Sequence, residues 1–272
     1  MSRLWSERLC IALLPDRLAW VMPARGWGKR IRAQGSVPVL VAAEGNLWQA
    51  TLEALQRELP NIPVARAEVS VVLSNAFVRY LVINSSTALS NAEERLALAR
   101  HDFQKIHGVP AEAWEIRIAA GEQNYLAAAL DGELLEQLRH CFAATKLKLH
   151  SIQPYAVAAF NHWSKHFNGK SAEGFFLSEP HGYCYAGMSG GQLEFFHCGR
   201  WEGNPLETYQ RVVQREALRS GINARKMWMA PVHESSLAKS LTQQDGVQLL
   251  PLSVPLRDEQ QAEYLTVLIG AA

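Results

Sequence analysis

Four side chains that can bind a metal ion lie close together in the last third of the chain: His181, Cys184, His197 and Cys198. Imidazole and thiolate are ligands that zinc prefers in proteins. However, His197 and Cys198 are adjacent, so in a strand they would point to opposite faces, and at most three of the four could converge. The paired spacing that is typical of zinc sites is also missing. We therefore predict ordinary buried or half-buried side chains here and no metal site.

Other patterns that could carry catalysis have a structural explanation. The segment Gly187-Met188-Ser189-Gly190-Gly191 lacks the Lys-Ser/Thr pair and the helix that follow a phosphate-binding loop, so it predicts a hairpin turn. No nucleophile-elbow motif supports Ser-His-Asp chemistry. The carboxylate pairs Glu93-Glu94 and Asp258-Glu259 lie in the first turns of expected helices, where they complement the helix dipole. These patterns predict no catalytic residue and no cofactor.

The charge balance excludes a general nucleic-acid binder. The chain has 272 residues with 27 Lys and Arg against 26 Asp and Glu, a net charge of +1. A nearly neutral chain has no overall field that would concentrate nucleic acid or anionic lipid. One small basic cluster, Arg25, Lys29, Arg30 and Arg32 beside Trp27, is best interpreted as a solvated hairpin.

Cysteine usage and hydropathy indicate a soluble protein of a reducing compartment. The chain has 4 cysteines and no Cys-x-x-Cys pair, so we expect free thiols that act as small apolar residues. No apolar run reaches the length of roughly 18–20 residues that spans a bilayer. The 8 tryptophans, several of them in expected turns, mildly favour a protein that binds other proteins, although core packing is the default for each.

The elements that must position these residues follow from hydrophobic period and turn signals. A helix over Asn91–Ile106 begins with Ser90 as cap and Glu93 completing a capping box, and it ends at Gly108. The elements expected up to residue 167 are strands Arg8–Leu14, Leu18–Met22 and Lys29–Val37, a helix that Pro60 ends, strands Glu68–Leu73 and Phe77–Ile83, this helix, a hairpin of Trp114–Ala119 with Asn124–Leu130, a helix from Asp131 to about Thr145, a strand Lys148–Ile152 and a helix Tyr155–Phe167.

The same order recurs after the polar linker 168–171. Asn204 caps a helix that has Pro205 at its first position and ends at Gly221. The elements expected in this part are strands Phe175–Leu177, Tyr183–Met188 and Gln192–Cys198, this helix, strand Lys226–Met229, helix Glu234–Leu241, strand Val247–Leu250 and helix Asp258–Leu268. The repeat predicts a duplicated α/β fold with halves 1–167 and 172–272, and with a subdomain inserted at about 86–130.

Two units of three antiparallel strands followed by alternating helix and strand resemble the actin-like ATPase fold, in which each half has a mixed, ribonuclease H-like sheet flanked by helices. A more specific resemblance covers about thirty residues: the segment Leu73–Ile83, which reads LSNAFVRYLVI, and the helix that contains ERLALAR. These segments are similar to PilM and to the cytoplasmic part of GspL, actin-like proteins of type IV pili and type II secretion in proteobacteria.

The resemblance also locates the expected nucleotide site. ATP-binding members of the fold have an Asp-x-Gly turn after the first strand of each half, where backbone N–H groups bind phosphate and the Asp holds hydrated metal. By register, Ala12 and Leu14 replace this Asp and Gly in the first half, and Leu177 and Glu179 replace them in the second. The Gly-Gly turn under the adenosine would fall at Met229-Ala230-Pro231-Val232, which has no glycine. The sequence therefore predicts a pseudo-ATPase that binds no nucleotide.

The resemblance implies a non-catalytic scaffold in a type IV pilus or type II secretion-like assembly complex of a Gram-negative bacterium. It would lie in the cytoplasm at the inner-membrane face, associated with the membrane only through a partner, and would bind the PilN-like cytoplasmic tail of that partner. The surface around Leu73–Ile83 and the helix Asn91–Ile106 is the expected contact region. The alternative is an active ATPase or kinase of the same superfamily, in which a small shift of register would let Asp16, in the turn after Pro15, hold the metal. A third hypothesis is an unrelated α/β protein without a true duplication.

Overall fold

The structure is a computed structural model that describes residues 7–24, 31–40, 46–84, 91–119, 124–167, 171–222, 224, 226–230 and 248–252. By their contacts, the described residues within 1–78 and 130–162 form one compact unit, and those within 79–129 and 163–253 form a second. The predicted halves, 1–167 and 172–272, divide the chain by repeated element order rather than by contacts, so they stay a prediction.

The first unit is built on a five-stranded sheet with the order β3-β2-β1-β4-β8. Its strands are β1 (Glu7–Leu14), β2 (Arg17–Pro23), β3 (Ile31–Pro38), β4 (Ala67–Leu73) and β8 (Lys148–Pro154). The first three form an antiparallel meander, whereas β4 pairs in parallel with both β1 and β8. β1 and β4 are apolar and buried along nearly their whole length, as expected for central strands that are covered on both faces.

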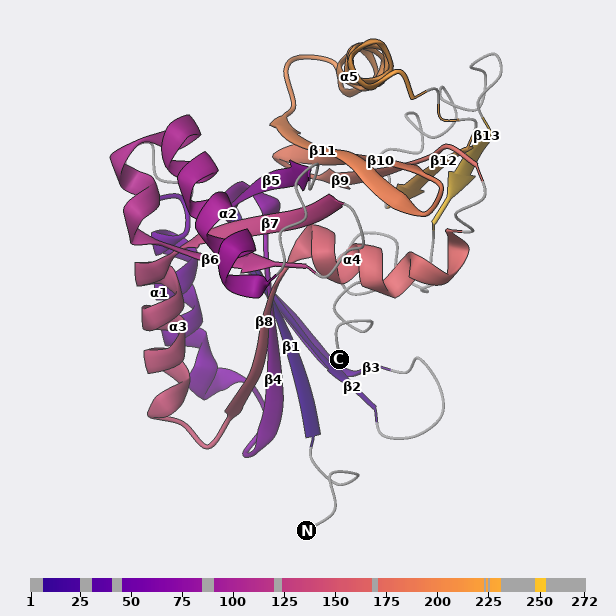
Figure 1. Cartoon of the computed structure of the whole chain (residues 1–272). Coiled ribbons are helices and arrows are strands. Elements are labelled where there is room, and N and C mark those ends of the chain that lie inside the picture. The colour runs from indigo at the N-terminus through magenta and orange to yellow at the C-terminus, as the bar shows by residue number, and fades with distance from the viewer. Residues whose placement is uncertain are drawn as a thin grey trace. The chain divides into compact units, whose positions relative to one another are not determined.

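Helices α1 (Gln49–Glu58) and α3 (Gly132–Ala143) flank this sheet, and α4 (Tyr155–Trp163) follows β8 (Figure 1). α1 buries one stripe of residues, which includes Leu52 and Leu55, and ends in a short 3₁₀ turn at Leu59–Asn61 that contains Pro60. The side chain of Asp131 caps α3 by accepting from the N–H of Glu133. The buried residues of α1 and α3 are mainly aliphatic.

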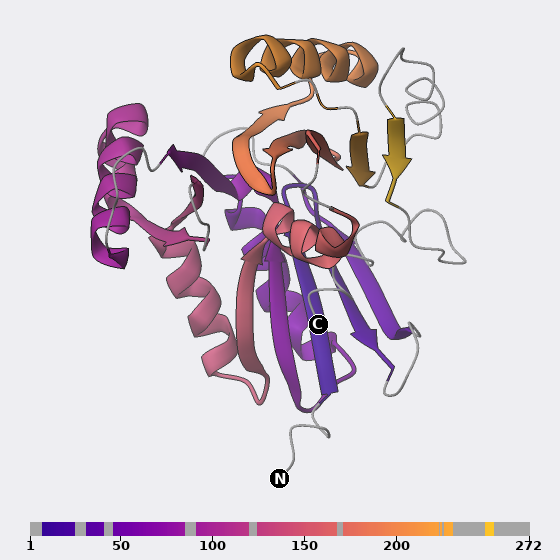
Figure 2. The same ribbon diagram turned by 45° about the vertical axis from the view of Figure 1, so that its right-hand side comes forward.

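The second unit repeats the sheet with the order β11-β10-β9-β12-β13. Its strands are β9 (Glu173–Glu179), β10 (Gly182–Ser189), β11 (Gln192–Arg200), β12 (Lys226–Ala230) and β13 (Gln248–Pro251). Again three antiparallel strands precede two parallel ones. α5 (Pro205–Ser220) covers one face of this sheet (Figure 2), with Tyr209 and Val212 in the shared core. The predicted cap at Asn204 and the stop at Gly221, whose φ is +71°, are confirmed.

A separate three-stranded sheet with the order β5-β7-β6 carries α2 (Ala92–His107) on one side. Its strands are β5 (Val78–Asn84), β6 (Trp114–Ile118) and β7 (Asn124–Asp131). The helix begins one residue later than predicted: Asn91, not Ser90, is the cap. Its side chain accepts from the N–H of Glu94 and donates to that carboxylate, so the predicted capping box with Glu93 is wrong by one position.

The predicted duplication of the α/β element order is confirmed by the two sheets, which have the same strand order and directions. The predicted helices Glu234–Leu241 and Asp258–Leu268 and most of the linker 168–171 lie outside the described residues. Within the described part of the chain, no helix is long and apolar enough to cross a membrane.

Candidate functional site

The turn between β1 and β2 consists of Pro15 and Asp16, and internal hydrogen bonds hold it in place. The carbonyl of Leu14 accepts a 2.6 Å bond from the Thr51 hydroxyl, and the carbonyl of Asp16 accepts a 2.7 Å bond from the N–H of Val39. Ala12 and Leu14, the residues predicted to replace the Asp and Gly of a nucleotide site, are 4% and 3% exposed. These two positions are part of the core of the first unit.

The turn between β9 and β10 consists of Pro180 and His181, and it is built in the same way. The carbonyl of Glu179 accepts a 2.7 Å bond from the indole N–H of Trp201. The carboxyl group of Glu179 is buried, and its negative charge acts with the larger effect of burial to raise the pKa of Tyr80 well above its usual value. A carboxylate at this position repels a phosphate group.

In both turns, the residue before the proline has its carbonyl hydrogen-bonded by a side chain of the same unit. Proline has no N–H, so each turn offers a phosphate group one backbone donor fewer than a turn without proline would. Among the described residues, positive φ angles occur only at glycines, and neither two-residue turn contains one. Without glycine, side chains keep the backbone at a distance from a ligand. The geometry of each turn favours a closed hairpin over a nucleotide cradle.

The segment predicted to replace the Gly-Gly turn of a nucleotide site begins at the end of β12. The carbonyl of Met229 accepts a 2.7 Å bond from the N–H of Leu252, and Met229 and Ala230 are buried. Pro231 and Val232 lie outside the described residues. The described part of this segment therefore continues the sheet.

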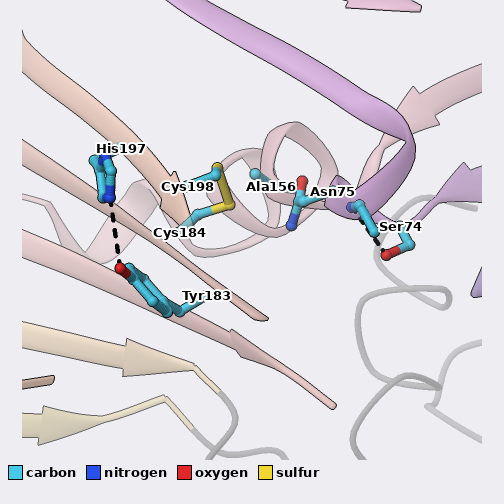
Figure 3. Close-up of a disulfide and its surroundings, with 8 residues drawn as sticks. Ser74, Asn75, Ala156, Tyr183, Cys184, His197 and Cys198 are labelled. Atoms are coloured by element: carbon cyan, nitrogen blue, oxygen red, sulfur yellow. Dashed lines mark hydrogen bonds between the residues drawn. A yellow bond between two sulfur atoms is a disulfide. The ribbon is translucent and has the colours of Figure 1, made fainter. Parts of the chain in front are cut away.

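The Leu-Ser-Asn motif that carries the family resemblance has a structural role within the first unit (Figure 3). The N–H of Ser74 donates to the carbonyl of Leu13, and its hydroxyl accepts from the N–H of Ala76. The buried Asn75 side chain accepts a 3.0 Å bond from the N–H of Ala156, in the first turn of α4. The motif therefore ties the end of β4 to β1 and to the start of α4.

Cys184 and Cys198 form a disulfide across β10 and β11 (Figure 3), so the predicted free thiols at these positions are wrong. The prediction that His197 and Cys198 face opposite sides is confirmed, because His197 lies 3.5 Å from the Tyr183 hydroxyl on the α5 side of the sheet. Burial is the main cause that lowers the pKa of His197. No group of three or more His, Cys, Asp or Glu side chains in the described residues could hold a metal ion.

The remaining predicted features are accounted for as follows. Gly190 and Gly191 have φ angles of +58° and +80°, which confirms the hairpin turn. Arg32 pairs with Glu7, whereas the other members of the basic cluster, and Trp27, lie outside the described residues. Two side chains that the sequence did not identify, Thr51 and Trp201, anchor the turns. Their donor groups are distant in sequence from the carbonyls they reach, so no local signal marks them.

Solved structures similar to this chain have the actin-like ATPase fold. A chain of the PilM–PilN type IV pilus biogenesis complex matches with a TM-score of 0.68 and 16% identity, over 97% of this chain and 97% of that chain. A Bacteroides thetaiotaomicron protein of actin-like ATPase fold and unknown function matches with 0.67 and 12%, over 99% and 98%. The cytoplasmic domain of EpsL, an inner-membrane component of the Vibrio cholerae type II secretion system, matches with 0.60 and 12%, over 97% and 93%.

The fold is also shared by an enzyme, an inorganic polyphosphate/ATP-glucomannokinase from an Arthrobacter strain, at a TM-score of 0.51 and 10% identity over 98% of this chain and 96% of that one. The similarity to these solved structures over nearly the whole chain confirms the predicted α/β, actin-like fold. No family model and no curated protein matches the sequence.

Proposed function

We propose that the chain is a non-catalytic scaffold of a type IV pilus or type II secretion-like assembly complex, which binds the cytoplasmic tail of an inner-membrane partner. The observation that carries the proposal is the construction of the two hairpin turns. Each has a proline, which offers no N–H to a phosphate group, and in each a side chain, Thr51 or Trp201, donates to the carbonyl before that proline. A chain of this fold that binds no nucleotide would act by binding other proteins through its surface.

The likeness to a chain of the PilM–PilN complex supports the class of partner, because it extends over nearly the whole of both chains. In this proposal the partner holds the chain at the cytoplasmic face of the inner membrane. The expected contact region remains the surface of β5 and α2, where Arg79 on β5 and Ile106 on α2 are exposed.

A thermal melt with and without millimolar Mg-ATP tests the expected absence of nucleotide binding. A ligand that binds only the folded state at a hundredfold excess over its Kd stabilises that state by about 2.7 kcal/mol. We expect no upward shift in Tm, with an actin-like kinase as the positive control. A clear upward shift would favour the active ATPase or kinase instead.

A titration tests the partner. Synthetic peptides of the cytoplasmic tails of the host's single-span pilus and secretion assembly proteins are added to the full chain, and binding is followed by tryptophan fluorescence and calorimetry. We expect one tail to bind saturably at 1:1 while its scrambled version does not. Binding by none of the tails overturns the scaffold proposal.

A further inference from the structure

We propose that Cys184 and Cys198 form a reversible redox switch, in which a disulfide locks the edge strand β11 onto β10. The two residues lie directly opposite each other in the antiparallel ladder, with a Cα–Cα distance of 4.1 Å. So close an approach is typical of non-hydrogen-bonded pairs, where side chains are nearest. The thiols of the reduced chain therefore remain neighbours, ready to form the bond again.

An irregularity in the hairpin creates this pairing. Counting back from the turn at Gly190-Gly191, a regular ladder would place Cys184 opposite His197. The register shifts by one residue between Gly187 and Met188, and this shift brings Cys198 opposite Cys184 instead. Gly187 is needed there, because a Cβ at that position would lie 2.1 Å from the ring of Phe195.

The pair differs in environment from the two other cysteines. Cys10 is fully buried in the first unit, and burial raises its pKa to about 12, so its thiol is inert at neutral pH. Cys141 accepts a 3.4 Å hydrogen bond from the Gln56 amide and has no second thiol beside it. Cys198 is half-buried on an edge strand, whereas Cys184 is only 2% exposed. Cys198 is therefore the sulfur that an external thiol or disulfide reaches.

The reaction is a thiol–disulfide exchange with a small disulfide such as oxidised glutathione. The Cys198 thiolate attacks one glutathione sulfur, which forms a mixed disulfide and releases one glutathione thiolate. The Cys184 thiolate then attacks the Cys198 sulfur and releases the second. The two protons and two electrons lost by the cysteines are carried by two molecules of reduced glutathione, and reduction follows the reverse path.

The bond acts at a strand that links two parts of the second unit. Among the described residues, β11 pairs with β10 alone. On the three-stranded sheet, the Asn124 amide donates a 2.7 Å bond to the carbonyl of Leu193, and the Tyr80 ring lies 4.8 Å from the ring of Phe196. Oxidation therefore fixes the strand on which these two contacts depend.

The experiment equilibrates the full chain in buffers of increasing ratio of reduced to oxidised glutathione. Alkylation and peptide mass spectrometry give the oxidised fraction of the pair, and hydrogen–deuterium exchange is measured on the fully oxidised and reduced forms. We expect the pair to change state within this series. We also expect faster exchange in β11, and a Tm lower by roughly 6–12 °C, in the reduced form.

The matched control is Cys141→Ser, which removes a half-buried thiol outside the pair and should leave the redox midpoint unchanged. Cys198→Ser should show exchange in β11 like that of the reduced wild type under all buffers. Three results overturn the proposal: a pair that stays reduced throughout, a pair that stays oxidised throughout, or oxidised and reduced forms with equal exchange in β11. The titration of the wild type does not depend on the folding of either variant.

Discussion

The two five-stranded sheets have the same strand order but different cores. The largest fully buried side chains of β1 and β2 are aliphatic or sulfur-containing and include Leu9, Ile11 and Met22, whereas those of the second sheet and α5 include Phe176, Tyr185 and Tyr209. In both sheets the central strands are buried along nearly their whole length. The comparison shows that the pattern of buried positions fixes this topology, while the identity of the apolar residue is free to change.

The two hairpin turns show the same principle for polar groups. In the first unit, the hydroxyl of a helix residue, Thr51, holds the carbonyl before the turn, and in the second an indole at the end of β11, Trp201, does so. The environments differ, since Pro15 is buried and Pro180 is exposed. Two unrelated donors, a hydroxyl and an indole N–H, therefore bind the equivalent carbonyl in two turns that have no glycine.

The largest expected effect comes from giving each turn its missing glycine. Leu14→Gly removes a buried side chain and should lower the free energy of unfolding by about 3–5 kcal/mol. Glu179→Gly removes a carboxylate and adds mainly backbone freedom, so we expect a smaller loss of about 1–2 kcal/mol. Urea denaturation gives both values, and Leu14→Ile is the volume-matched control. A glycine variant that keeps its stability and gains a Tm shift with Mg-ATP would show that the turn is a latent phosphate cradle.

High pH should destabilise each unit through a different buried group, Cys10 in the first and Tyr185 in the second. Burial raises the pKa of Cys10 in the first unit from 9.0 to about 12, and that of Tyr185 in the second from 10.0 to about 12, with Glu216 adding to the latter. Both groups are neutral when protonated, so the stability they contribute is present below the unfolded-state pKa and is lost as pH rises towards 12. One unit of pKa shift corresponds to about 1.4 kcal/mol, so the losses are about 2–4 kcal/mol each.

The measurement is the free energy of unfolding in urea between pH 8 and 12. Cys10→Ala should remove the part of the decline that begins near pH 9, and Tyr185→Phe the part that begins near pH 10. Wild-type stability that is constant from pH 9 to 12 would contradict both assignments.

Local sequence signals predicted the fold well, whereas contacts between residues distant in sequence could not be predicted from them. The boundaries of α5 follow from Asn204, Pro205 and Gly221, which act on the backbone next to them. The cap of α2 was misplaced by one residue because Ser90 and Asn91 are both good caps, and only the backbone geometry chooses between them. Neighbouring residues of similar propensity therefore limit the precision of a boundary.

The replacement of the Asp-x-Gly residues stays a prediction from register, which rests on β1 and β9 being the first strands of their sheets in the chain. The donors that close the turns are not readable, since Thr51 lies 37 residues from Leu14. The Cys184–Cys198 pairing was missed for a different reason: it depends on a one-residue register shift between Gly187 and Met188, and Gly187 was interpreted as part of the hairpin turn and not as a bulge signal.

The turn anchors themselves should have moderate and unequal effects. Thr51→Val keeps the shape of the side chain but leaves the Leu14 carbonyl without its 2.6 Å donor, which should cost about 1–2 kcal/mol because Thr51 is fully buried. Trp201→Phe removes the donor to Glu179 at a half-buried site, so we expect about 1 kcal/mol. Thr51→Ser, which keeps the hydroxyl, is the control. A Thr51→Val variant as stable as the wild type would show that this hydrogen bond contributes nothing to stability.

The smallest expected effect is a gain, and it tests the aromatic core. The hydroxyl of Tyr209 is buried and has no hydrogen-bond partner in the described residues, while its ring packs edge-on against Phe176 at 4.9 Å. Tyr209→Phe keeps the ring and removes the unpaired hydroxyl, so it should raise the free energy of unfolding by up to about 1 kcal/mol. Tyr183→Phe is the matched control, because its hydroxyl lies 3.5 Å from His197 and its loss should be neutral or destabilising. Urea denaturation of the three proteins at pH 7 decides the point. A destabilised Tyr209→Phe would mean that the hydroxyl binds a buried water, and the second core would then be less purely apolar than the first.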